Sequence, residues 1–454
     1  MKLFAAHALL PGGWAADVLL ETDAAGMLVA VTPDAIGDGA VRAAGPVVAG
    51  MPNLHSHAFQ RALAGRTGAA GGAGDSFWAW RQAMYAFLDR VDADAFQAIA
   101  TQAYIEMLRA GYTAVAEFHY VHHDPAGHPY ADPAELAWRI VAAAREAGIA
   151  LTLLPVFYAH AGFGGAPPLP EQRRFVHTVD GFLRLQARVT AAARDGGYIA
   201  GVAPHSLRAV AADELGAVVA GCPVDAPLHI HAAEQAEEVE ACIAATGLAP
   251  VAWLVERAGI DGRWCVVHAT HVTADELGAL VHRGVHVGLA PTTEADLGDG
   301  TFPAADFVAR RGSFGIGSDS NTQIDPFAEL RQLEWSQRLA LRRRNVLGIG
   351  AAGTVGTALW SAAAQGGARA LAQPVGALAT GCRADLVVLD TRDAALAEQR
   401  IDDVLDAAMF GPARRPVRDV LVAGRWVVRD GRHLRDEKAL DAFRRALRAV
   451  GRRD

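Results

Sequence analysis

The chain has 454 residues, of which 52% are hydrophobic and 20% are charged, so it suits a large α/β barrel with a smaller module and not a disordered protein. A net charge of −8 without any Lys/Arg-rich block argues against a nucleic-acid binder. No apolar run reaches the ~18 residues of a membrane span, and four scattered cysteines without a C-x-x-C motif favour a reducing cytoplasm. A homodimer stays open, because the sequence does not define the oligomeric state.

The two ends of the chain have the same character. Residues 1–48 alternate short apolar runs with turn signals, and residues 384–390 and 419–431 do so again near the other end. We therefore predict that residues 1–48 and 372–454 form one composite β-sandwich domain with a C-terminal helix. Residues 49–371 would then be a second domain inserted between them.

The middle of the chain alternates strand-like and helix-like segments. Eight strand-like segments in about 270 residues favour a (β/α)8 TIM-type barrel over an open doubly wound sheet. The strand-like segments are a first one ending at His55, followed by 113–118, 150–157, 198–203, 227–232, 264–269, 285–290 and 315–320. The helix-like segments are 93–110, 133–147, 178–193, 212–220, 234–246 and 274–283.

Histidines and other polar residues follow most of these strands. His55 and His57 leave the first strand on the same side, because residues i and i+2 of an extended chain share a face. A lone histidine at a strand end is more often a packing residue than a ligand. In a barrel, however, all strands end at one functional face, and so many polar ends are improbable there by chance. The other strand-end residues are His119 and Tyr120, His205 and Arg208, His231 and Glu234, His268, and Asp319.

A metal site is the best interpretation of these strand-end residues. His55, His57, His231 and Asp319 form a ligand set for zinc that leaves a position for water, whose pKa zinc lowers toward ~7. Glu234, three residues after His231, is a candidate proton shuttle at the start of the next helix. Its ordinary alternative is a helix N-terminal carboxylate. His268 could polarise the electrophilic centre, and Asp319 could accept the proton of the water.

This pattern resembles the amidohydrolase superfamily. The resemblance rests on His55-x-His57, His231, His268 and the segment Gly317-Ser318-Asp319-Ser320, and it covers nearly the whole chain. The only lysines are Lys2 and Lys438. The resemblance therefore implies the mononuclear branch, with one Zn²⁺ per chain, and excludes members that use a carboxylated lysine to bridge two metals.

Five longer blocks resemble one family within this branch, the formimidoylglutamate deiminases. That resemblance implies hydrolysis of N-formimino-L-glutamate to N-formyl-L-glutamate and ammonia, as in histidine degradation. It further implies that Asp319 accepts the water proton, that Glu234 protonates the departing nitrogen and that His268 stabilises the tetrahedral intermediate. The blocks are 52–61, 76–81, 117–123, 205–210 and 294–300.

The implied substrate is a small formimino dicarboxylate, whose two carboxylates need cations. Arg81 and Arg208 are the candidates, because guanidinium binds carboxylate in a bidentate manner. By resemblance, Gln60, Tyr120 and His205 complete the polar lining. The ordinary alternative for Arg81 is a surface arginine.

Other functions remain open from sequence alone. One is another aminohydrolase of the branch, acting on guanine, an S-adenosyl compound or a triazine, and another is a non-catalytic metal-binding barrel. Asn321 departs from the family pattern, in which a histidine is expected. The glycine-rich stretch 66–74 and the loop 160–168 are either covers over the site or passive loops.

Overall fold

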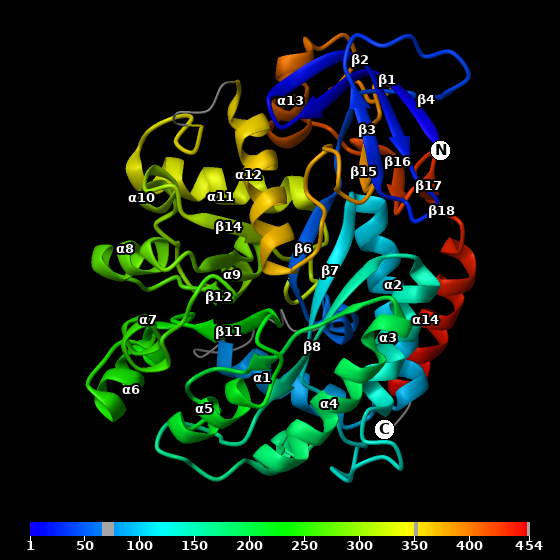
Figure 1. Cartoon of the computed structure of the whole chain (residues 1–454). Coiled ribbons are helices and arrows are strands. Elements are labelled where there is room, and N and C mark those ends of the chain that lie inside the picture. The colour runs from blue at the N-terminus through cyan, green and yellow to red at the C-terminus, as the bar shows by residue number, and fades with distance from the viewer. Residues whose placement is uncertain (66–76, 349–352, 452–454) are drawn as a thin grey trace.

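The computed structural model describes residues 1–65, 77–348 and 353–451. Figure 1 shows a small mixed sheet above a larger barrel of strands and helices. The predicted stretch 66–74 lies outside the described residues, so its role as a cover stays a prediction. Among the described residues, no single helix has both the length and the apolar character of a membrane span, although a bent pair, residues 236–246 with 250–258, passes that test jointly.

The larger unit is a curled parallel sheet of the TIM-barrel kind, as predicted. Its order is β10-β8-β7-β6-β14-β13-β12-β11, and β9 pairs with β8. Parallel bridges from Val202 to Leu228 and from Ser206 to His231 join its two edges. The strands are β6 (Met51–Ser56), β7 (Tyr112–His119), β8 (Ala150–Phe157), β9 (Ile199–Ala200), β10 (Ala203–Pro204), β11 (Leu228–Ala232), β12 (Trp264–His268), β13 (His286–Leu289) and β14 (Ser313–Ile316).

Helices cover the outside of this sheet. The helices predicted from the sequence are found within a few residues of their expected bounds, and others lie between and beyond them. They are α1 (Phe77–Leu88), α2 (Ala93–Ala110), α3 (Glu135–Ala147), α4 (Val179–Gly196), α5 (Ala212–Ala220), α6 (Ala236–Thr246), α7 (Pro250–Trp253), α8 (Ala274–His282), α9 (Pro291–Leu297), α10 (Ala304–Ala309), α11 (Pro326–Leu341), α12 (Val355–Ala370), α13 (Val404–Phe410) and α14 (Asp436–Gly451).

The fourth predicted strand is split into β9 and β10. Gly201 lies at the break, and a Cβ there would come within 2.7 Å of the Pro227 carbonyl oxygen. This close approach of two backbones requires glycine at that position. The interruption therefore comes from packing between neighbouring strands.

The two chain ends pair with each other, as predicted. They form one mixed sheet in the order β18-β17-β16-β15-β5-β1-β2-β3, in which β4 also pairs with β1. The link between the two ends is the antiparallel pair of β5 with β15. The strands are β1 (Lys2–Leu10), β2 (Gly13–Thr22), β3 (Leu28–Thr32), β4 (Val41–Arg42), β5 (Val47–Ala49), β15 (Leu386–Leu389), β16 (Val417–Val422), β17 (Arg425–Arg429) and β18 (Arg432–His433).

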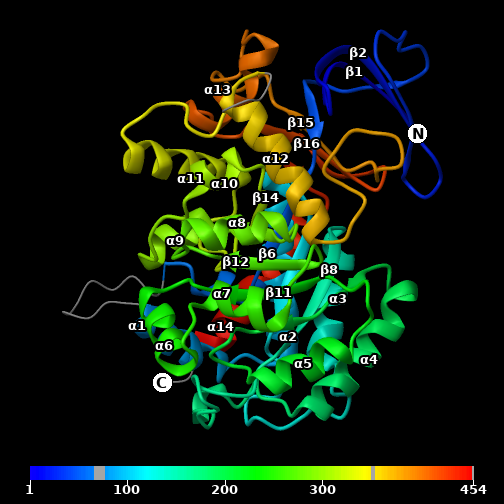
Figure 2. The same cartoon turned by 60° about the vertical axis from the view of Figure 1, so that its left-hand side comes forward.

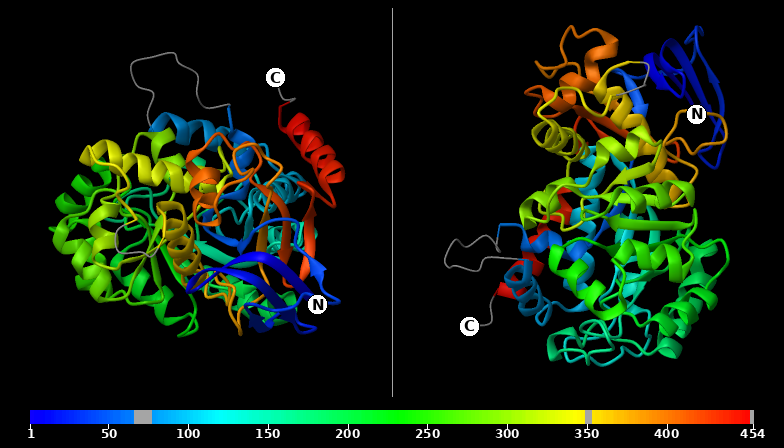
Figure 3. Two further views of the ribbon diagram at one scale, coloured as in Figure 1. Left: turned by 90° about the horizontal axis from the view of Figure 1, so that it is seen from above. Right: turned by 90° about the vertical axis from the view of Figure 1, so that its left-hand side faces the viewer.

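Two helices connect the small sheet with the barrel. Helix α12 packs on β6 and β14 (Figure 2), and its Trp360 Nε1 donates a hydrogen bond to the Ala49 carbonyl oxygen at 3.0 Å. Helix α14 packs along α2 at the outer edge of the barrel (Figure 3), with Arg109 Nη1 3.6 Å from Asp436 Oδ1. The domain boundaries 1–48, 49–371 and 372–454 stay a prediction.

Candidate metal centre and adjoining cavity

Three imidazoles and one carboxylate converge where the barrel strands end. His231 Nε2 lies 3.1 Å from His55 Nε2. Asp319 Oδ1 lies 3.3 Å from His55 Nε2 and 3.3 Å from His57 Nε2. His55 and Asp319 are more than 250 positions apart in the sequence, but β6 and β14 are neighbouring strands. The curl of the sheet brings the end of β11, with His231, close to them.

These spacings suit a tetrahedral zinc ion. Zinc bonds of 2.0–2.1 Å give ligand-to-ligand edges of about 3.3–3.4 Å in a tetrahedron. Without a cation, the His55 and His231 nitrogens would face each other at 3.1 Å with only a single proton to share. The donor set therefore fits a zinc ion, and each of the four residues is at most 6% exposed.

The backbone orients the ligand rings. His57 Nδ1 lies 3.1 Å from the Phe118 carbonyl oxygen, and His231 Nδ1 lies 3.1 Å from that of His205. An Nδ1–H that donates to a carbonyl leaves the Nε2 lone pair free for a metal. His55 Nδ1 is buried and has no hydrogen-bond partner among the described residues.

Asn321 fastens the two ligand-bearing strand ends together. Its Nδ2 donates to the His57 and Asp319 carbonyl oxygens, each at 3.0 Å, and its Oδ1 accepts from Ser318 Oγ at 2.6 Å. The side chain is fully buried. Asn321, which stands where a histidine was expected, thus holds the backbone of two of the proposed metal ligands in place.

The ligand residues have the protonation states that a metal requires. Burial lowers the pKa of His57 to about 3 and also lowers those of His55 and His231. Burial opposes ionisation of Asp319, but His55 and His57 outweigh it and hold the pKa of its carboxyl below the usual value. The imidazoles are therefore neutral and the carboxylate is ionised, as metal binding needs.

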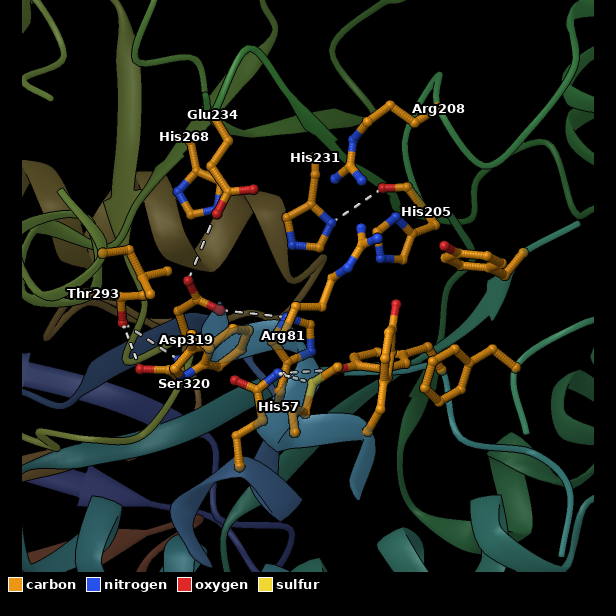
Figure 4. Close-up of a pocket in the computed structure, with 18 residues that line it drawn as sticks. His57, Arg81, His205, Arg208, His231, Glu234, His268, Thr293, Asp319 and Ser320 are labelled. Carbon is orange, nitrogen blue, oxygen red and sulfur yellow. Dashed lines mark hydrogen bonds and ion pairs between the residues drawn. The ribbon is translucent and has the colours of Figure 1, made fainter. Parts of the chain in front are cut away.

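Glu234 and His268 lie beside this centre. His268 Nε2 is 3.7 Å from Glu234 Oε1 and 3.8 Å from Asp319 Oδ2. Figure 4 shows these three side chains close together. Burial raises the pKa of Glu234 to about 7. Burial alone would lower the pKa of His268, but the carboxylates of Glu234, Glu294 and Asp319 raise it well above its usual value.

The position of Glu234 differs in one respect from the prediction. Helix α6 begins at Ala236, so Glu234 lies in the turn before it and not at its start. Ala233 in that turn has a φ of 55°. The carboxyl of Glu234 therefore owes its place to this turn, while its backbone N–H donates to Glu238 Oε2 at 3.1 Å.

Two site residues have left-handed backbone conformations. His268 has a φ of 69° and Asp319 a φ of 42°. Such conformations cost about 1–3 kcal/mol each for residues other than glycine and are maintained only by surrounding structure. His268 ends β12 and Asp319 follows β14 by three residues, so these backbone conformations turn both side chains toward the same point.

A cavity opens onto these groups. Every residue predicted from the sequence for catalysis, metal or substrate binding lines it, except His55, which lies behind His57 and His231. In Figure 4, Glu234, His268 and Asp319 occupy one side, and Arg208 and His205 the other. The remaining lining residues are Trp80, Met84, Tyr85, Tyr158, Phe175, Thr293, Leu297 and Ser320.

Polar contacts order the far side of the cavity. Gln60 Nε2 donates to the Tyr120 hydroxyl oxygen at 2.8 Å, and His205 Nδ1 lies 3.0 Å from Ser206 Oγ. Arg208 lies near Tyr158, whose hydroxyl oxygen accepts a hydrogen bond from the buried Gln172 Nε2 at 2.7 Å. This side therefore presents guanidinium, imidazole and hydroxyl groups around an aromatic wall.

Sequence reasoning missed Tyr158, and it gave no role to Glu294 although that residue begins the block 294–300. Tyr158 directly follows β8, and Glu294 lies five residues after the end of β13. Glu294 Oε1 is 3.2 Å from His268 Nδ1. Both residues follow barrel strands, β8 and β13, to which the sequence analysis had assigned no functional residue. The rule that polar residues after strands face the site would therefore have indicated both.

Behind the cavity lies a group of buried histidines, among them His119, which the strand-end rule had singled out. His119 does not line the cavity and packs on Phe96 and His122. Burial lowers its pKa to about 3, and His177, part of the same group, is lowered to about 3 as well. These rings are neutral in the folded protein.

We expect this group to make the fold sensitive to acid. A histidine in the unfolded chain binds a proton near pH 6.5, whereas buried His119 does so near pH 3. The stabilisation that neutral His119 contributes to the fold is therefore present above pH 6.5 and is lost as the pH falls toward 3. Between pH 6 and pH 5, the free energy of unfolding of the unchanged protein should fall about 1 kcal/mol more than that of the His119→Gln variant. Urea unfolding at both pH values measures this, with exposed His128→Gln as control. The prediction would be contradicted if the free energy of unfolding of His119→Gln fell as much between pH 6 and pH 5 as that of the unchanged protein.

Three comparisons place the chain among known proteins. Residues 47–427 match the family model described as the amidohydrolase family. The chain is 52% identical to formimidoylglutamate deiminase of Pseudomonas aeruginosa over 98% of both sequences. It is only 26% identical, over 94% of this chain and 90% of the relative, to 5-methylthioadenosine/S-adenosylhomocysteine deaminase of Haloarcula marismortui.

The fold comparison agrees with the sequence comparison. A crystal structure of an amidohydrolase from Brucella melitensis superposes with a TM-score of 0.94 at 46% identity and covers 99% of each chain. Both the barrel and the sheet made from the two chain ends are therefore shared with that protein.

Proposed function

The chain belongs to the amidohydrolase family, and within it we propose that the protein hydrolyses N-formimino-L-glutamate to N-formyl-L-glutamate and ammonia. The observation that carries this proposal is the pairing, in one cavity, of a zinc-type ligand set with two arginines, Arg81 and Arg208. The zinc-type ligand set suits attack of water on a C=N carbon, and the two arginines suit a substrate with two carboxylates. We also propose the cytoplasm as location, because all four cysteines are free thiols.

The proposed cofactor is one zinc ion per chain, held by His55, His57, His231 and Asp319. When bound, zinc makes water acidic enough to act as a nucleophile near pH 7. The geometric support is the set of 3.1–3.3 Å spacings among the four ligand atoms.

Three side chains handle protons and charge during the proposed reaction. Asp319 Oδ2, the carboxylate oxygen turned toward His268, accepts the proton of the attacking water. Glu234, with a pKa of about 7, delivers a proton to the nitrogen that leaves as ammonia, because a group that titrates near the working pH serves proton transfer best. His268, held charged by its carboxylate neighbours, stabilises the negative charge that develops on the heteroatoms of the tetrahedral intermediate.

Five side chains bind the substrate in this proposal. Arg81 and Arg208 each pair with one of its carboxylates, and Gln60, Tyr120 and His205 complete the polar lining. Arg208 keeps its charge although it is buried, because Glu238, Tyr158 and Glu234 raise the pKa of its guanidinium against the effect of burial. A permanent cation in a confined cavity selects an anionic ligand.

The alternatives fit the cavity less well. Guanine and S-adenosyl compounds have no pair of carboxylates that two guanidinium groups could bind. The relative named for S-adenosyl compounds is also much more distant than the one named for formimidoylglutamate. A purely structural metal site needs no proton shuttle such as Glu234. It also has no open coordination position for water.

Ammonia release tests the proposal directly. We expect zinc-loaded protein to release ammonia from N-formimino-L-glutamate, with a kcat/KM about 100-fold or more above that for N-formimino-glycine, which lacks the second carboxylate. Guanine serves as the comparator for the rival activity. No turnover of N-formimino-L-glutamate, or equal turnover of the glycine analogue, would contradict the substrate assignment.

A further inference from the structure

A second group of potential metal ligands lies beside the first one. Glu234, His268 and Asp299 bring a carboxylate oxygen, an imidazole nitrogen and another carboxylate oxygen within 4.8 Å of one another. Glu234 follows β11, His268 ends β12 and Asp299 follows α9. All three side chains are buried, and none belongs to the four proposed ligands of the first site.

His268 is prepared as a metal ligand. Its Nδ1 lies 3.2 Å from Glu294 Oε1, which also accepts a hydrogen bond from the Ala290 backbone N–H at 3.0 Å. Its Nε2 is buried, points toward Glu234 and makes no hydrogen bond within the described part of the chain. A histidine whose Nδ1 is fixed by a carboxylate has the arrangement typical of metal-binding histidines. The neighbouring carboxylates keep His268 protonated as long as no cation is bound, so a divalent cation would take the place of the Nε2 proton.

Asp299 offers the second open atom. The residue is 4% exposed, Oδ1 accepts a hydrogen bond from Gln235 Nε2, and Oδ2 is buried without a partner among the described residues. The backbone is held on both sides: its N–H donates to the Glu294 carbonyl oxygen at 2.9 Å and its carbonyl oxygen lies 2.8 Å from His271 Nε2. A buried carboxylate oxygen with no partner requires a proton or a cation.

We propose that Glu234, His268 and Asp299 form a second, weaker binding site for a divalent cation of the zinc class, and that its occupation inhibits the enzyme. Two carboxylates and one imidazole are a ligand set that suits zinc, and the charges of the carboxylates cancel that of a divalent ion. Inhibition follows because the ion occupies Glu234 and His268, which the proposed reaction needs for its proton and charge transfer. The inhibition rests on the proposed function, whereas the binding does not.

Counting bound zinc tests the binding without any substrate. Protein carrying one zinc per chain is dialysed against rising free zinc, up to millimolar, and zinc per chain is measured. We expect a second zinc to bind the unchanged protein and the Asp296→Asn control, whose changed residue is exposed three positions away. The Asp299→Asn variant should retain the first zinc and bind the second at least about 10-fold more weakly.

Activity measured along the same titration tests the inhibition. The rate of ammonia release should fall as the second zinc binds, and Asp299→Asn should need about 10-fold more zinc for the same fractional loss. Only one zinc per chain in the unchanged protein, or an undiminished second zinc in Asp299→Asn, would overturn the site. A second zinc that leaves the rate unchanged would overturn the inhibition.

A second variant covers a failure of Asp299→Asn to fold, which loss of the first zinc would reveal. Glu234→Gln removes another ligand of the second site, and zinc counting applies to it although it is expected to be nearly inactive. It should bind one zinc per chain; two would overturn the site. If N-formimino-L-glutamate is not hydrolysed but two zinc ions bind, the proposed function fails while the second site stands.

Discussion

Replacing Glu234 by glutamine should lower kcat for N-formimino-L-glutamate about 10³-fold and leave KM within a few-fold of its starting value. Glutamine has the shape of glutamate but cannot donate or accept the transferred proton. Glu234 lies beside His268 at 3.7 Å and lines the cavity, but it is outside the proposed zinc ligand set. The loss should therefore fall on the chemical step and not on substrate binding.

Steady-state kinetics and metal analysis together check this expectation. The matched control is Glu237→Gln, the same substitution at an exposed position three residues further along the chain, and it should retain full activity. First-site zinc should be equal in all three proteins. A kcat within about tenfold of the original would contradict the proton-transfer role, and loss of the first zinc would show that Glu234 supports the metal centre instead.

The barrel and the clustering of the proposed zinc ligands were predictable from the sequence for one geometric reason. The carboxyl ends of parallel strands meet at one face of a barrel, so polar residues there are neighbours whatever their separation in the chain. His55, His57, His231, His268 and Asp319 all follow this rule. Their positions in the sequence, together with the alternation of strands and helices, were therefore sufficient to predict that they cluster.

Features set by atomic packing were not predictable in this way. The split between β9 and β10 depends on how closely Gly201 approaches Pro227. The position of Asp299 depends on the path of the loop after α9, and no periodicity in the sequence describes that path. The left-handed conformations of His268 and Asp319 are likewise imposed by surrounding structure, since residues of these types do not require them.

The role of Asn321 was also not predictable from the sequence. The sequence marked it as a departure from a family pattern, but the consequence of that departure is visible only in its hydrogen bonds to the His57 and Asp319 carbonyl oxygens. A buried amide that joins two ligand-bearing strand ends is a structural support of the metal site. Its replacement of the expected histidine therefore leaves the ligand set itself intact.

Replacing Arg208 by methionine should raise KM for N-formimino-L-glutamate about 100-fold or more, with the zinc content unchanged. Methionine retains most of the apolar stem and removes the charge, so a substrate carboxylate would enter the confined cavity without its cation. Losing one partner of a buried charge pair costs about 2–5 kcal/mol, which corresponds to about 30-fold to several thousand-fold in affinity. Arg208 lines the cavity on the side opposite Glu234 and His268 (Figure 4), so the loss should fall mainly on substrate binding. Because the Arg208 charge lowers the pKa of Glu234, the variant should also shift the pH dependence of kcat upward.

The glycine analogue sharpens this test into a cycle between enzyme and substrate. If Arg208 binds the carboxylate that N-formimino-glycine lacks, Arg208→Met should lower kcat/KM for the glutamate compound and leave that for the glycine compound nearly unchanged. If Arg81 binds that carboxylate, Arg81→Met should show this pattern, and Arg208→Met should weaken both substrates alike. Exposed Arg194→Met on α4 is the control for a general loss of positive charge. Selectivity that neither cavity variant reduces would contradict recognition of the dicarboxylate by these arginines, and loss of zinc from Arg208→Met would assign that residue a structural role.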